Sequence, residues 1–328
     1  MPADTLTRPL LAATGHAAPA LSVVVPCYNE QEVLEQFYTR TAAVRDRLGA
    51  AWEIVLVNDG STDGTLGLML GLQAADPRIA VVNLSRNFGK EIALTAGLDH
   101  ARCTDAVVVI DADLQDPPEV IPALDDAARQ GFDVAYAQRS LRHGESWLKR
   151  TTASAFYRVM QRLGGRVQLP QDTGDFRLMS RRALDALLAL REQHRFMKGL
   201  FAWVGFPSVA VPYERAPRAA GTTKWNWWKL WNLSLEGITS FTVGPLKIAS
   251  YLGLVVAFFA ALYIVQLLVR TFFFGNPVAG FPSLMAAVLF LGGVQMMMLG
   301  IIGEYLGRIF NETRRRPLYL VERHLPSA

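Results

Sequence analysis

The sequence carries little charge for its length, and one long stretch carries almost none. Charged residues make up 19% of the 328 residues, against roughly 25% in an ordinary soluble protein. Residues 248–303 contain one charged side chain, Arg270. An uncharged stretch of this length excludes a plain soluble protein, a disordered chain and a fibrous repeat.

Cysteine is also scarce, and the net charge is small. The chain has two cysteines, Cys27 and Cys103, which excludes a disulfide scaffold and a multi-cysteine zinc module. The net charge of +4 suits an anionic membrane surface or a phosphorylated substrate, and it gives no indication of nucleic acid binding.

Several common catalytic and cofactor motifs are missing. The sequence has no G-x-G-x-x-G after its first apolar run, no G-x-x-x-x-G-K-[ST], no H-E-x-x-H, no paired C-x-x-C and no G-x-S-x-G. Their absence excludes the usual dinucleotide, P-loop, zinc-hydrolase and serine-hydrolase sites.

From residue 21 onward, apolar runs of strand length alternate with helix-like stretches. The expected strands are 21–26, 53–58, 79–84, 106–111 and 132–137. The expected helices between them are 29–49, 64–76, 89–102 and 117–130. This alternation predicts a parallel sheet covered on both faces. The fold class is therefore α/β, a doubly wound, Rossmann-like domain with its site at the carboxyl ends of the strands.

The remaining soluble-looking segments are less regular. We expect residues 1–20 to form a flexible tail, and its apolar run is too short for a secretory signal. The domain is therefore expected in the cytosol, with both thiols reduced. Residues 144–203 are expected to be mostly helical, with Ser180 as the N-cap of a helix over 180–190, and residues 206–213 to form a strand.

Two uncharged stretches, 248–269 and 281–303, each exceed the ~20 residues needed to cross a bilayer. They predict a hairpin of two transmembrane helices, about 246–270 and 281–303, within residues 244–307. A buried core hairpin is the alternative, although core helices seldom run so far without a charge. The arginines of the basic tail 308–328 place both termini and the domain on the cytoplasmic side; Arg270 alone opposes this orientation.

Tryptophan is concentrated before the hairpin, since four of the seven tryptophans lie in residues 225–231. Indole rings prefer the headgroup layer of a membrane. Residues 225–243 are therefore expected to form an interfacial amphipathic helix that brings the domain of residues 21–224 to the bilayer. An aromatic core cluster is the alternative interpretation.

Polar clusters follow the first, second and fourth expected strands, and they converge because these strand ends share one edge of the sheet. The clusters are 26–30, 58–64 and 111–118. In the third cluster, Asp111, Asp113 and Gln115 offer oxygen ligands that suit Mg²⁺ or Mn²⁺. Such an ion would bridge the oxygens of a diphosphate. An isolated D-x-D is equally compatible with a solvated acidic turn.

The other two clusters have two interpretations as well. Asp59 ends a strand of Ile, Val and Leu, and its carboxylate is a candidate acceptor for a base edge or a ribose hydroxyl. Turn formation, with helix capping by Ser61 or Thr62, is the alternative. Asn29 and Glu30 are equally compatible with the start of the next helix.

Taken together, these segments resemble glycosyltransferase family 2, whose catalytic domain has the nucleotide-sugar-binding GT-A fold. The matching text is VVVPCYNE (23–30), VNDGSTDGT (57–65), LSRNFGKEIALTAGLDHA (84–101), DADLQDPPE (111–119), TGDFRLMSR (173–181) and RAPRAAGTTKW (215–225). With two hydrophobic helices behind it, the chain resembles the bacterial polyprenyl-phosphate glycosyltransferase branch related to dolichol-phosphate mannose synthase. The resemblance covers roughly residues 21–310.

The resemblance implies roles for residues at matching positions. Residues that would bind the nucleotide sugar are Pro26, Tyr28, Glu30, Asp59, Lys90, Asp111, Ala112, Asp113, Arg218 and Lys224. Residues that would hold the metal are Asp111, Asp113 and Gln115, and those that would hold an acceptor phosphate are Arg139, Arg150 and Ser154. Thr223 stands where the family often has Ser, a mild departure. A solvated basic helix is the alternative for the acceptor residues around Arg150.

A phosphate acceptor needs no general base, because a phosphate monoester with a second pKa of about 6 is largely dianionic at neutral pH. The enzyme must align the nucleophile and stabilise the leaving diphosphate. We therefore expect Asp111, Asp113, Arg139 and Arg150 to carry the chemistry, with inversion at the anomeric carbon. Asp172 and Asp175 are expected to touch sugar hydroxyls or to order their loop.

The expected function is transfer of one sugar, with UDP-glucose favoured as donor over GDP-linked sugars, to undecaprenyl phosphate at the cytoplasmic face of a bacterial inner membrane. Two alternatives stay open. A processive polysaccharide synthase would carry a Gln-x-x-Arg-Trp motif, from which Gln193–Phe196 departs. A non-catalytic two-helix membrane module with a nucleotide-binding domain is the other. The glycines Gly292, Gly293, Gly300 and Gly303 leave a homo-oligomer open too.

Overall fold

The computed structural model describes residues 18–48, 51–140, 170, 173–193, 195–214 and 280–328, together with individual residues between 251 and 273. Four of the expected site residues lie outside this part of the chain: Arg150, Ser154, Arg218 and Lys224. The expected interfacial helix over 225–243 and Asp172 lie outside it too.

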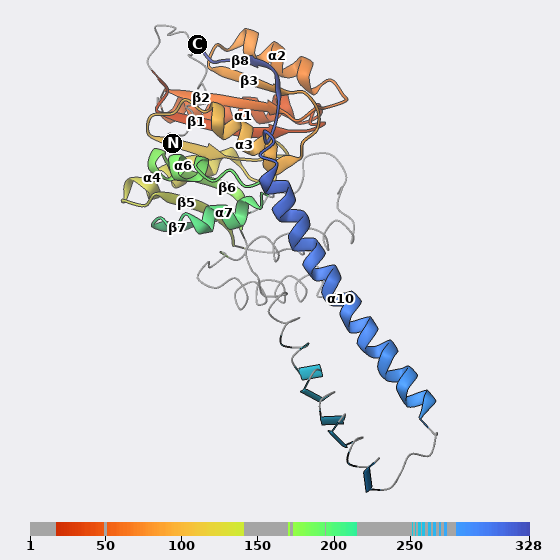
Figure 1. The fold of residues 1–328 in the computed structure, drawn as a ribbon. Helices are drawn as coiled ribbons and strands as arrows, with labels where there is room; N and C mark the ends of the chain where they lie inside the picture. Colours follow the sequence, from red (N-terminus) through yellow and green to blue (C-terminus); the bar gives the residue numbers. More distant parts are fainter. Residues whose placement is uncertain are drawn as a thin grey trace, which may run out of the picture.

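One eight-stranded sheet organises the domain, in the order β7-β5-β6-β4-β1-β2-β3-β8 (Figure 1). The strands are β1 (Leu21–Cys27), β2 (Trp52–Asn58), β3 (Ile79–Leu84), β4 (Ala106–Val109), β5 (Val134–Arg139), β6 (Thr173–Ser180), β7 (Ser208–Tyr213) and β8 (Val321–Leu325). The helices are α1 (Leu34–Leu48), α2 (Thr65–Ala75), α3 (Lys90–His100), the 3₁₀ turn η1 (Pro118–Val120), α4 (Ile121–Arg129), α6 (Arg181–Leu188), α7 (Met197–Trp203) and α10 (Phe281–Thr313).

The centre of the sheet is the parallel set β4-β1-β2-β3. The five strands expected from apolar runs are confirmed to within about two residues at each end, as is the strand expected over 206–213. Each central strand is buried along nearly its whole length, because helices cover both faces. The α/β class and the doubly wound centre are therefore as predicted.

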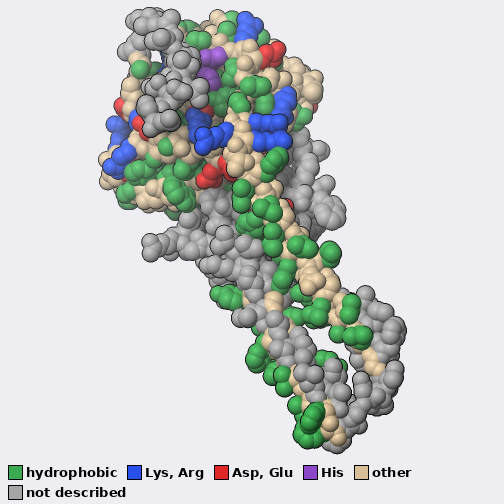
Figure 2. Space-filling view, in the orientation of Figure 1, with side chains coloured by type: hydrophobic (Ala, Val, Ile, Leu, Met, Phe, Trp, Pro, Cys, Tyr) green, Lys and Arg blue, Asp and Glu red, His purple; other side chains and the backbone are tan. Residues whose placement is uncertain are grey.

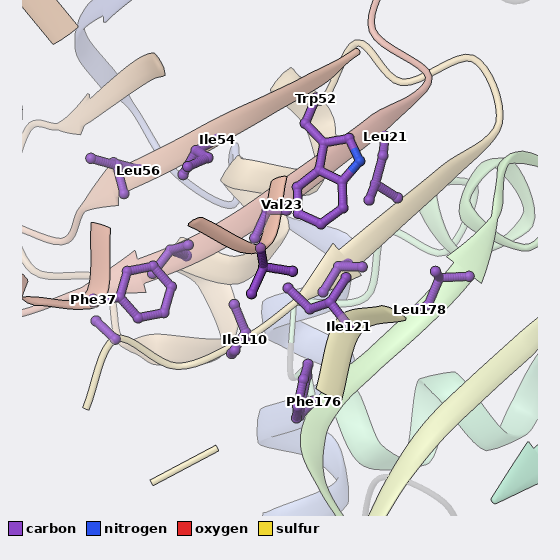
Figure 3. Packing of buried hydrophobic residues seen from close by; sticks show 14 of the residues in the cluster. Leu21, Val23, Phe37, Trp52, Ile54, Leu56, Ile110, Ile121, Phe176 and Leu178 are labelled. Atoms are coloured by element: carbon purple, nitrogen blue, oxygen red, sulfur yellow. The ribbon is translucent and has the colours of Figure 1, made fainter. Parts of the chain in front are cut away.

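Alternate residues of the strands supply two hydrophobic cores, one on each face of the sheet. Val23, Val25 and Phe37 belong to the cluster under α1 and α4 (Figure 3). Val24 and Val57 face the other cluster, under α3 and α6. A Cβ at Gly97 would lie 2.3 Å from Val24 Cγ1, so a glycine in α3 lets this helix approach the sheet closely.

Two parts of the sheet were not foreseen, and both make it mixed rather than parallel. Residues 173–180 were expected to be helical, but they form β6, antiparallel to β4 and β5. Its buried polar residues, Asp175 and Arg177, interrupt the apolar run that signals a buried strand. The helix after it starts as predicted: Ser180 Oγ caps α6 by accepting from the Ala183 N–H at 3.2 Å.

The C-terminal segment, expected as a basic tail after 308, is the second correction. Helix α10 continues to Thr313, and β8 then pairs antiparallel with β3 at the edge of the sheet. The end of the chain is held there: Ser327 Oγ donates to buried Glu53 Oε2 at 2.5 Å, and the Ala328 N–H donates to Pro77 O at 2.7 Å. Charged side chains in VERHL hid this strand from an apolar-run analysis.

Helix α10 projects away from the sheet domain, and its end at Thr313 lies at the domain (Figure 1). Its exposed surface is strongly apolar, with Phe290 62% and Met296 71% exposed, and Figure 2 shows hydrophobic side chains along it. Within the described residues, Phe290–Thr313 is the one helix long and apolar enough to cross a membrane. Described residues from Tyr251 to Phe273 are also helical, and a Cβ at Gly253 would lie 2.9 Å from Met298 Cε, so the two segments are packed together.

Candidate active site

The loops after β1 and β2 are bonded to each other. Asn29, in the left-handed region at φ 55°, accepts the Thr62 N–H at 2.8 Å through its side chain. The Asn29 N–H donates to Ser61 Oγ at 3.1 Å, and the Glu30 N–H donates to Thr65 Oγ1 at 3.0 Å. Asn29 and Glu30 thus precede a turn rather than starting α1, and Ser61 and Thr62 brace this loop rather than capping α2.

Asp59 serves the loop that follows β3. Its two carboxylate oxygens accept the N–H groups of Phe88 at 2.7 Å and Gly89 at 3.0 Å. Asp59 is buried, with only 2% of its surface exposed. Burial raises the pKa of Asp59 and the two main-chain N–H groups oppose this effect. In this structure Asp59 therefore fixes the turn into α3, whose first residue is Lys90.

Gly60 strengthens the same contact. It has φ +63°, and a Cβ there would lie 2.4 Å from the Asn87 nitrogen. Only glycine fits both the left-handed backbone and the close approach of the two loops. The Asn58-Asp59-Gly60 turn is therefore a rigid support for the start of α3.

Lys90 joins two acidic residues from different segments, the loop after β4 and strand β6. Its Nζ lies 2.7 Å from Asp111 Oδ2 and 2.7 Å from Asp175 Oδ2. The Asp111 side chain is 29% exposed and that of Asp175 is 8% exposed. Two of the expected donor-site residues, Lys90 and Asp111, are thus in contact, and Asp175 on β6 completes the group.

Asp175 is a buried acid of the site whose pKa is strongly shifted. Burial alone would raise its pKa, but Lys90, Lys198 and Arg177 hold the pKa of Asp175 below its usual value. Its Oδ1 is buried with no hydrogen-bond partner among the described residues. A buried, ionised oxygen of this kind is a ready acceptor for a substrate hydroxyl or another donor.

Two further members of this acidic and basic cluster, Glu91 and Lys198, were missed by sequence reasoning, and Arg177 was expected only as a partner of Asp172 or Asp175. Glu91 follows Lys90, and burial together with Asp175 raises the pKa of Glu91 to about 8. Burial lowers the pKa of Lys198, on α7. Arg177 is 5% exposed and donates to the main-chain oxygens of Gly174 and Asp175 at 3.0 and 3.2 Å. The period-2 alternation of polar and apolar residues over 173–178 was the signal that could have placed Asp175 and Arg177 on one face of a strand.

The D-x-D loop has the donor chemistry expected for a hard divalent cation. Asp113 Oδ1 accepts the Gln115 N–H at 3.1 Å, and Leu114 between them is buried with φ 59°. A leucine with left-handed backbone angles is uncommon, and this conformation persists only where the surrounding structure enforces it. The carboxylate and amide oxygens of Asp111, Asp113 and Gln115 are hard donors of the kind that Mg²⁺ and Mn²⁺ prefer, and Asp111 Oδ2 is bonded to the Lys90 ammonium at 2.7 Å.

No group of three or more His, Cys, Asp or Glu side chains suitable for a metal ion occurs in the described ranges. Two carboxylates are sufficient for Mg²⁺, which is usually held by one or two carboxylates and completed by substrate phosphates. Ala112, between the two aspartates, is buried.

The end of β1 lies close to this loop. Cys27 and Cys103 are free and buried. Burial raises the pKa of the Cys27 thiol, and the carboxylates of Glu30 and Asp111 raise it further, which means that both carboxylates lie near Cys27. Pro26 is partly buried on β1, and Tyr28 is 37% exposed beyond it.

Arg139 ends β5, as expected, and belongs to a second polar group beside the D-x-D loop. Its Nε donates to Tyr213 Oη at 3.4 Å, and Tyr213 donates to Asp116 Oδ1. A Cβ at Gly174 would lie 3.2 Å from Arg139 Nη2. Since Gly174 precedes Asp175, the arginine lies next to the Lys90 group.

Comparison with known proteins agrees with this architecture. The family model described as "Glycosyl transferase family 2" matches residues 22–188, and that of the "GtrB C-terminal hairpin" matches residues 244–309. An uncharacterized glycosyltransferase of Synechocystis sp. (strain ATCC 27184 / PCC 6803 / Kazusa) is 51% identical over 301 residues, 92% of this chain and 94% of the relative.

Two further relatives carry more specific names. The prophage bactoprenol glucosyl transferase homolog of Escherichia coli (strain K12) is 46% identical over 303 residues, 92% of this chain and 98% of the relative. The bactoprenol glucosyl transferase of Shigella phage SfV is 46% identical over 302 residues, with the same coverage of 92% and 98%. The chain belongs to glycosyl transferase family 2, and the family predicted from its motifs is confirmed.

Proposed function

We propose that this protein transfers one glucose from UDP-glucose to a polyprenyl phosphate, undecaprenyl phosphate, at the cytoplasmic face of the membrane. The observation that carries the proposal is the Lys90 group: one ammonium joined to Asp111 and Asp175 at 2.7 Å each, with Arg139 beside it. Relatives named bactoprenol glucosyl transferase, at 46% identity over most of their length, support glucose as the sugar and the lipid carrier as the acceptor.

Asp111 and Asp113, with Gln115, would hold Mg²⁺ or Mn²⁺, which stabilises negative charge on the leaving diphosphate when it is bound. Lys90 stays next to Asp111 and adds a further cation near the departing phosphate. Asp175 Oδ1 would accept a hydroxyl of the glucose, and Asp59 holds the turn that sets Lys90 in place. Pro26, Tyr28 and Glu30 would hold the base and ribose of the nucleotide.

The proposed acceptor-binding residues are mostly positively charged. Arg139, with Arg150, Ser154 and the closing residues Arg218 and Lys224 contributed by the rest of the chain, would bind anionic phosphates of acceptor and donor. The acceptor dianion attacks the anomeric carbon in line with the leaving diphosphate, so the configuration inverts.

The membrane arrangement is part of the proposal. Helix α10 and the packed helical segment from Tyr251 to Phe273 would form a two-span hairpin, with an interfacial helix over 225–243 before it. Figure 2 shows Lys and Arg side chains gathered on the domain where α10 meets it. Such a basic surface suits the anionic cytoplasmic leaflet, and both termini would lie on that side.

The test is transfer of radiolabelled sugar into an organic-solvent extract by the purified full-length protein in nanodiscs. Undecaprenyl phosphate with UDP-glucose and Mn²⁺ or Mg²⁺ is expected to give labelled lipid, and undecaprenol is expected to give none. Asp113→Asn should abolish product while the protein stays folded. A water-soluble polymer product would favour a processive synthase, and full activity of Asp113→Asn would contradict a metal-dependent transferase.

A further inference from the structure

Tyr213 links Arg139 to the loop that carries the two metal-site aspartates. Strands β5 and β7 pair in parallel, with Arg139 opposite Tyr213. The Tyr213 hydroxyl donates to Asp116 Oδ1 and accepts from Arg139 Nε at 3.4 Å. One phenol oxygen therefore lies between a guanidinium group and a carboxylate, and that carboxylate comes directly after Gln115.

The arrangement is rigid. Asp116 is 3% exposed and Tyr213 is 6% exposed. The Phe176 ring meets the Tyr213 ring edge-on, with centroids 6.1 Å apart. The Tyr213 main-chain oxygen accepts both the N–H and the hydroxyl of Ser140, at 3.0 and 2.9 Å. Ring, main chain and hydroxyl of Tyr213 are thus all fixed by neighbouring strands.

The order of the three groups has a chemical consequence. A guanidinium in direct contact with Asp116 would form an ion pair, which would compete with a phosphate for the same donors. The neutral phenol separates the two charges, yet it still hydrogen-bonds to both. Because Tyr213 engages Nε, the two terminal nitrogens of Arg139 are the pair suited to grip a phosphate end-on. Gly174 leaves room for one of these terminal nitrogens, because a Cβ at this position would lie only 3.2 Å from Arg139 Nη2.

We propose that Tyr213 is a positioning residue that keeps Arg139 aimed at the acceptor phosphate and away from a neutralising pair with Asp116, and that Asp116 anchors it to the metal loop. The inference rests on the proposed function, because it takes the acceptor to be a lipid phosphate. It assigns the recognition of that phosphate to a three-residue unit rather than to the arginines alone.

The test compares Tyr213→Phe with Tyr38→Phe in the full-length protein in nanodiscs. Tyr38 is a matched control because its hydroxyl donates to Asp76 Oδ2 at 3.0 Å, the same chemistry at a place remote from the site. Loss of a hydrogen bond to a charged group is expected to raise the KM for undecaprenyl phosphate about tenfold in Tyr213→Phe. The KM for UDP-glucose should stay unchanged, and Tyr38→Phe should show the wild-type KM for the lipid.

A second comparison separates positioning from a general effect on folding. In an Arg139→Gln background, Tyr213→Phe is expected to cause no further change in the lipid KM, because the group it positions is gone. An unchanged lipid KM in Tyr213→Phe, an equal rise in the KM for UDP-glucose, or full additivity with Arg139→Gln would overturn the inference.

A direct measurement of lipid binding distinguishes failure of this inference from failure of the proposed function. Binding of undecaprenyl phosphate and of undecaprenol is measured without a sugar donor. If the wild-type protein binds the phosphate lipid but transfers no glucose, the proposed function fails, and weaker binding by Tyr213→Phe still supports the inference. If the wild-type protein does not prefer the phosphate lipid over the alcohol, both fail.

Discussion

Lys90 Nζ lies 2.7 Å from Asp175 Oδ2, although the two residues come from a helix and a strand 85 positions apart in the sequence. This contact keeps a deeply buried carboxylate ionised. Burial opposes the charge on Asp175, and Lys90 is the largest of the influences that lower its pKa. The state of Asp175 therefore depends on a residue at the start of α3.

We predict that Lys90→Met shifts the acid limb of the activity profile to higher pH. Without the ammonium, burial raises the pKa of Asp175, so protonation inactivates the site at a higher pH than in the wild type. The measurement is kcat/KM against pH with saturating lipid. Arg129→Met, which removes an exposed ion pair with Asp125, is the control and should leave the profile in place. An unshifted acid limb in Lys90→Met would mean that Asp175 does not control it.

A second prediction concerns Asp59, which the sequence presents as a nucleotide ligand and the structure presents as a support for the Phe88–Gly89 turn. Asp59→Asn replaces one acceptor with an NH₂ group facing a main-chain N–H. The lost bond and the unsatisfied donor are expected to cost about 1–3 kcal/mol of stability, and kcat should fall because Lys90 is displaced.

Two measurements decide between these roles for Asp59. If it supports the turn, uridine affinity stays near the wild-type value, and Asp59→Asn adds little to the activity loss of Lys90→Met. If it binds the base, uridine affinity falls sharply, and the two substitutions act independently.

The sequence predicted the parts of this fold that are encoded by uninterrupted apolar runs or by short local motifs. The strands β1 to β4 are apolar runs, and the D-x-D and Asn58-Asp59-Gly60 segments are local motifs at strand ends. It missed β6 and β8, where buried Asp175 and Arg177, or exposed charges in 321–324, interrupt the apolar run. Hydrogen bonding explains why these strands tolerate polar residues. A polar side chain is stable in a sheet when a residue from a distant segment of the chain supplies its hydrogen-bond partner.

The same reason limits what motifs can say about the site. Lys90 and Asp111 each stood in a recognisable segment, but their contact with Asp175 depends on β6 lying antiparallel to β4. The partners of Asp59 lie 29 and 30 positions further along the chain. The spacing of residues along the sequence does not predict such long-range contacts.

A third prediction is a pH-dependent contribution to stability from Asp76. Its carboxylate meets Arg45 at 2.8 Å and Arg78 at 2.8 Å, and Asp76 and Arg45 are both 4% exposed in their side chains. Burial raises the pKa of Asp76, but Arg78, Arg45 and Tyr38 together outweigh it and hold the pKa well below its usual value. The folded pKa is depressed, so the stabilisation is present above the unfolded pKa of about 4 and is lost as the pH falls through the folded value.

Asp76→Asn is therefore expected to cost about 3 kcal/mol at pH 7, since it leaves buried Arg45 with only the exposed Asp46, at 3.1 Å, as a counter-charge. The difference in Tm from the wild type should shrink as the pH falls below about 4. Asp125→Asn, in an exposed pair with Arg129, is the control and should change the Tm little at any pH. A constant difference for Asp76→Asn across this range would contradict the assignment.

The last prediction concerns the segment that returns from α10 to the sheet. Tyr319 donates to Asp99 Oδ2 at 2.8 Å, and Glu312 accepts the Gln193 N–H at 2.7 Å. Asp99 lies in the last turn of α3, the helix that begins with Lys90. Through Tyr319, this segment ties the end of α10 to α3, the helix that begins at the candidate site.

Deletion of residues 321–328 removes β8, uncovers the edge of β3 and takes Ser327 away from buried Glu53. We expect a lower Tm, aggregation through the open edge, and a fall in kcat. Ser327→Ala should remove only the two hydrogen bonds of Ser327 Oγ, one donated to Glu53 and one accepted from Arg102, at about 1.5–3 kcal/mol for each. Thermal unfolding, light scattering and transfer assays in nanodiscs measure these effects. A deletion variant with wild-type Tm and activity would show that β8 is an accessory to the sheet, and the segment after α10 would then be held to the domain by the contacts of Tyr319, Glu312 and Arg316.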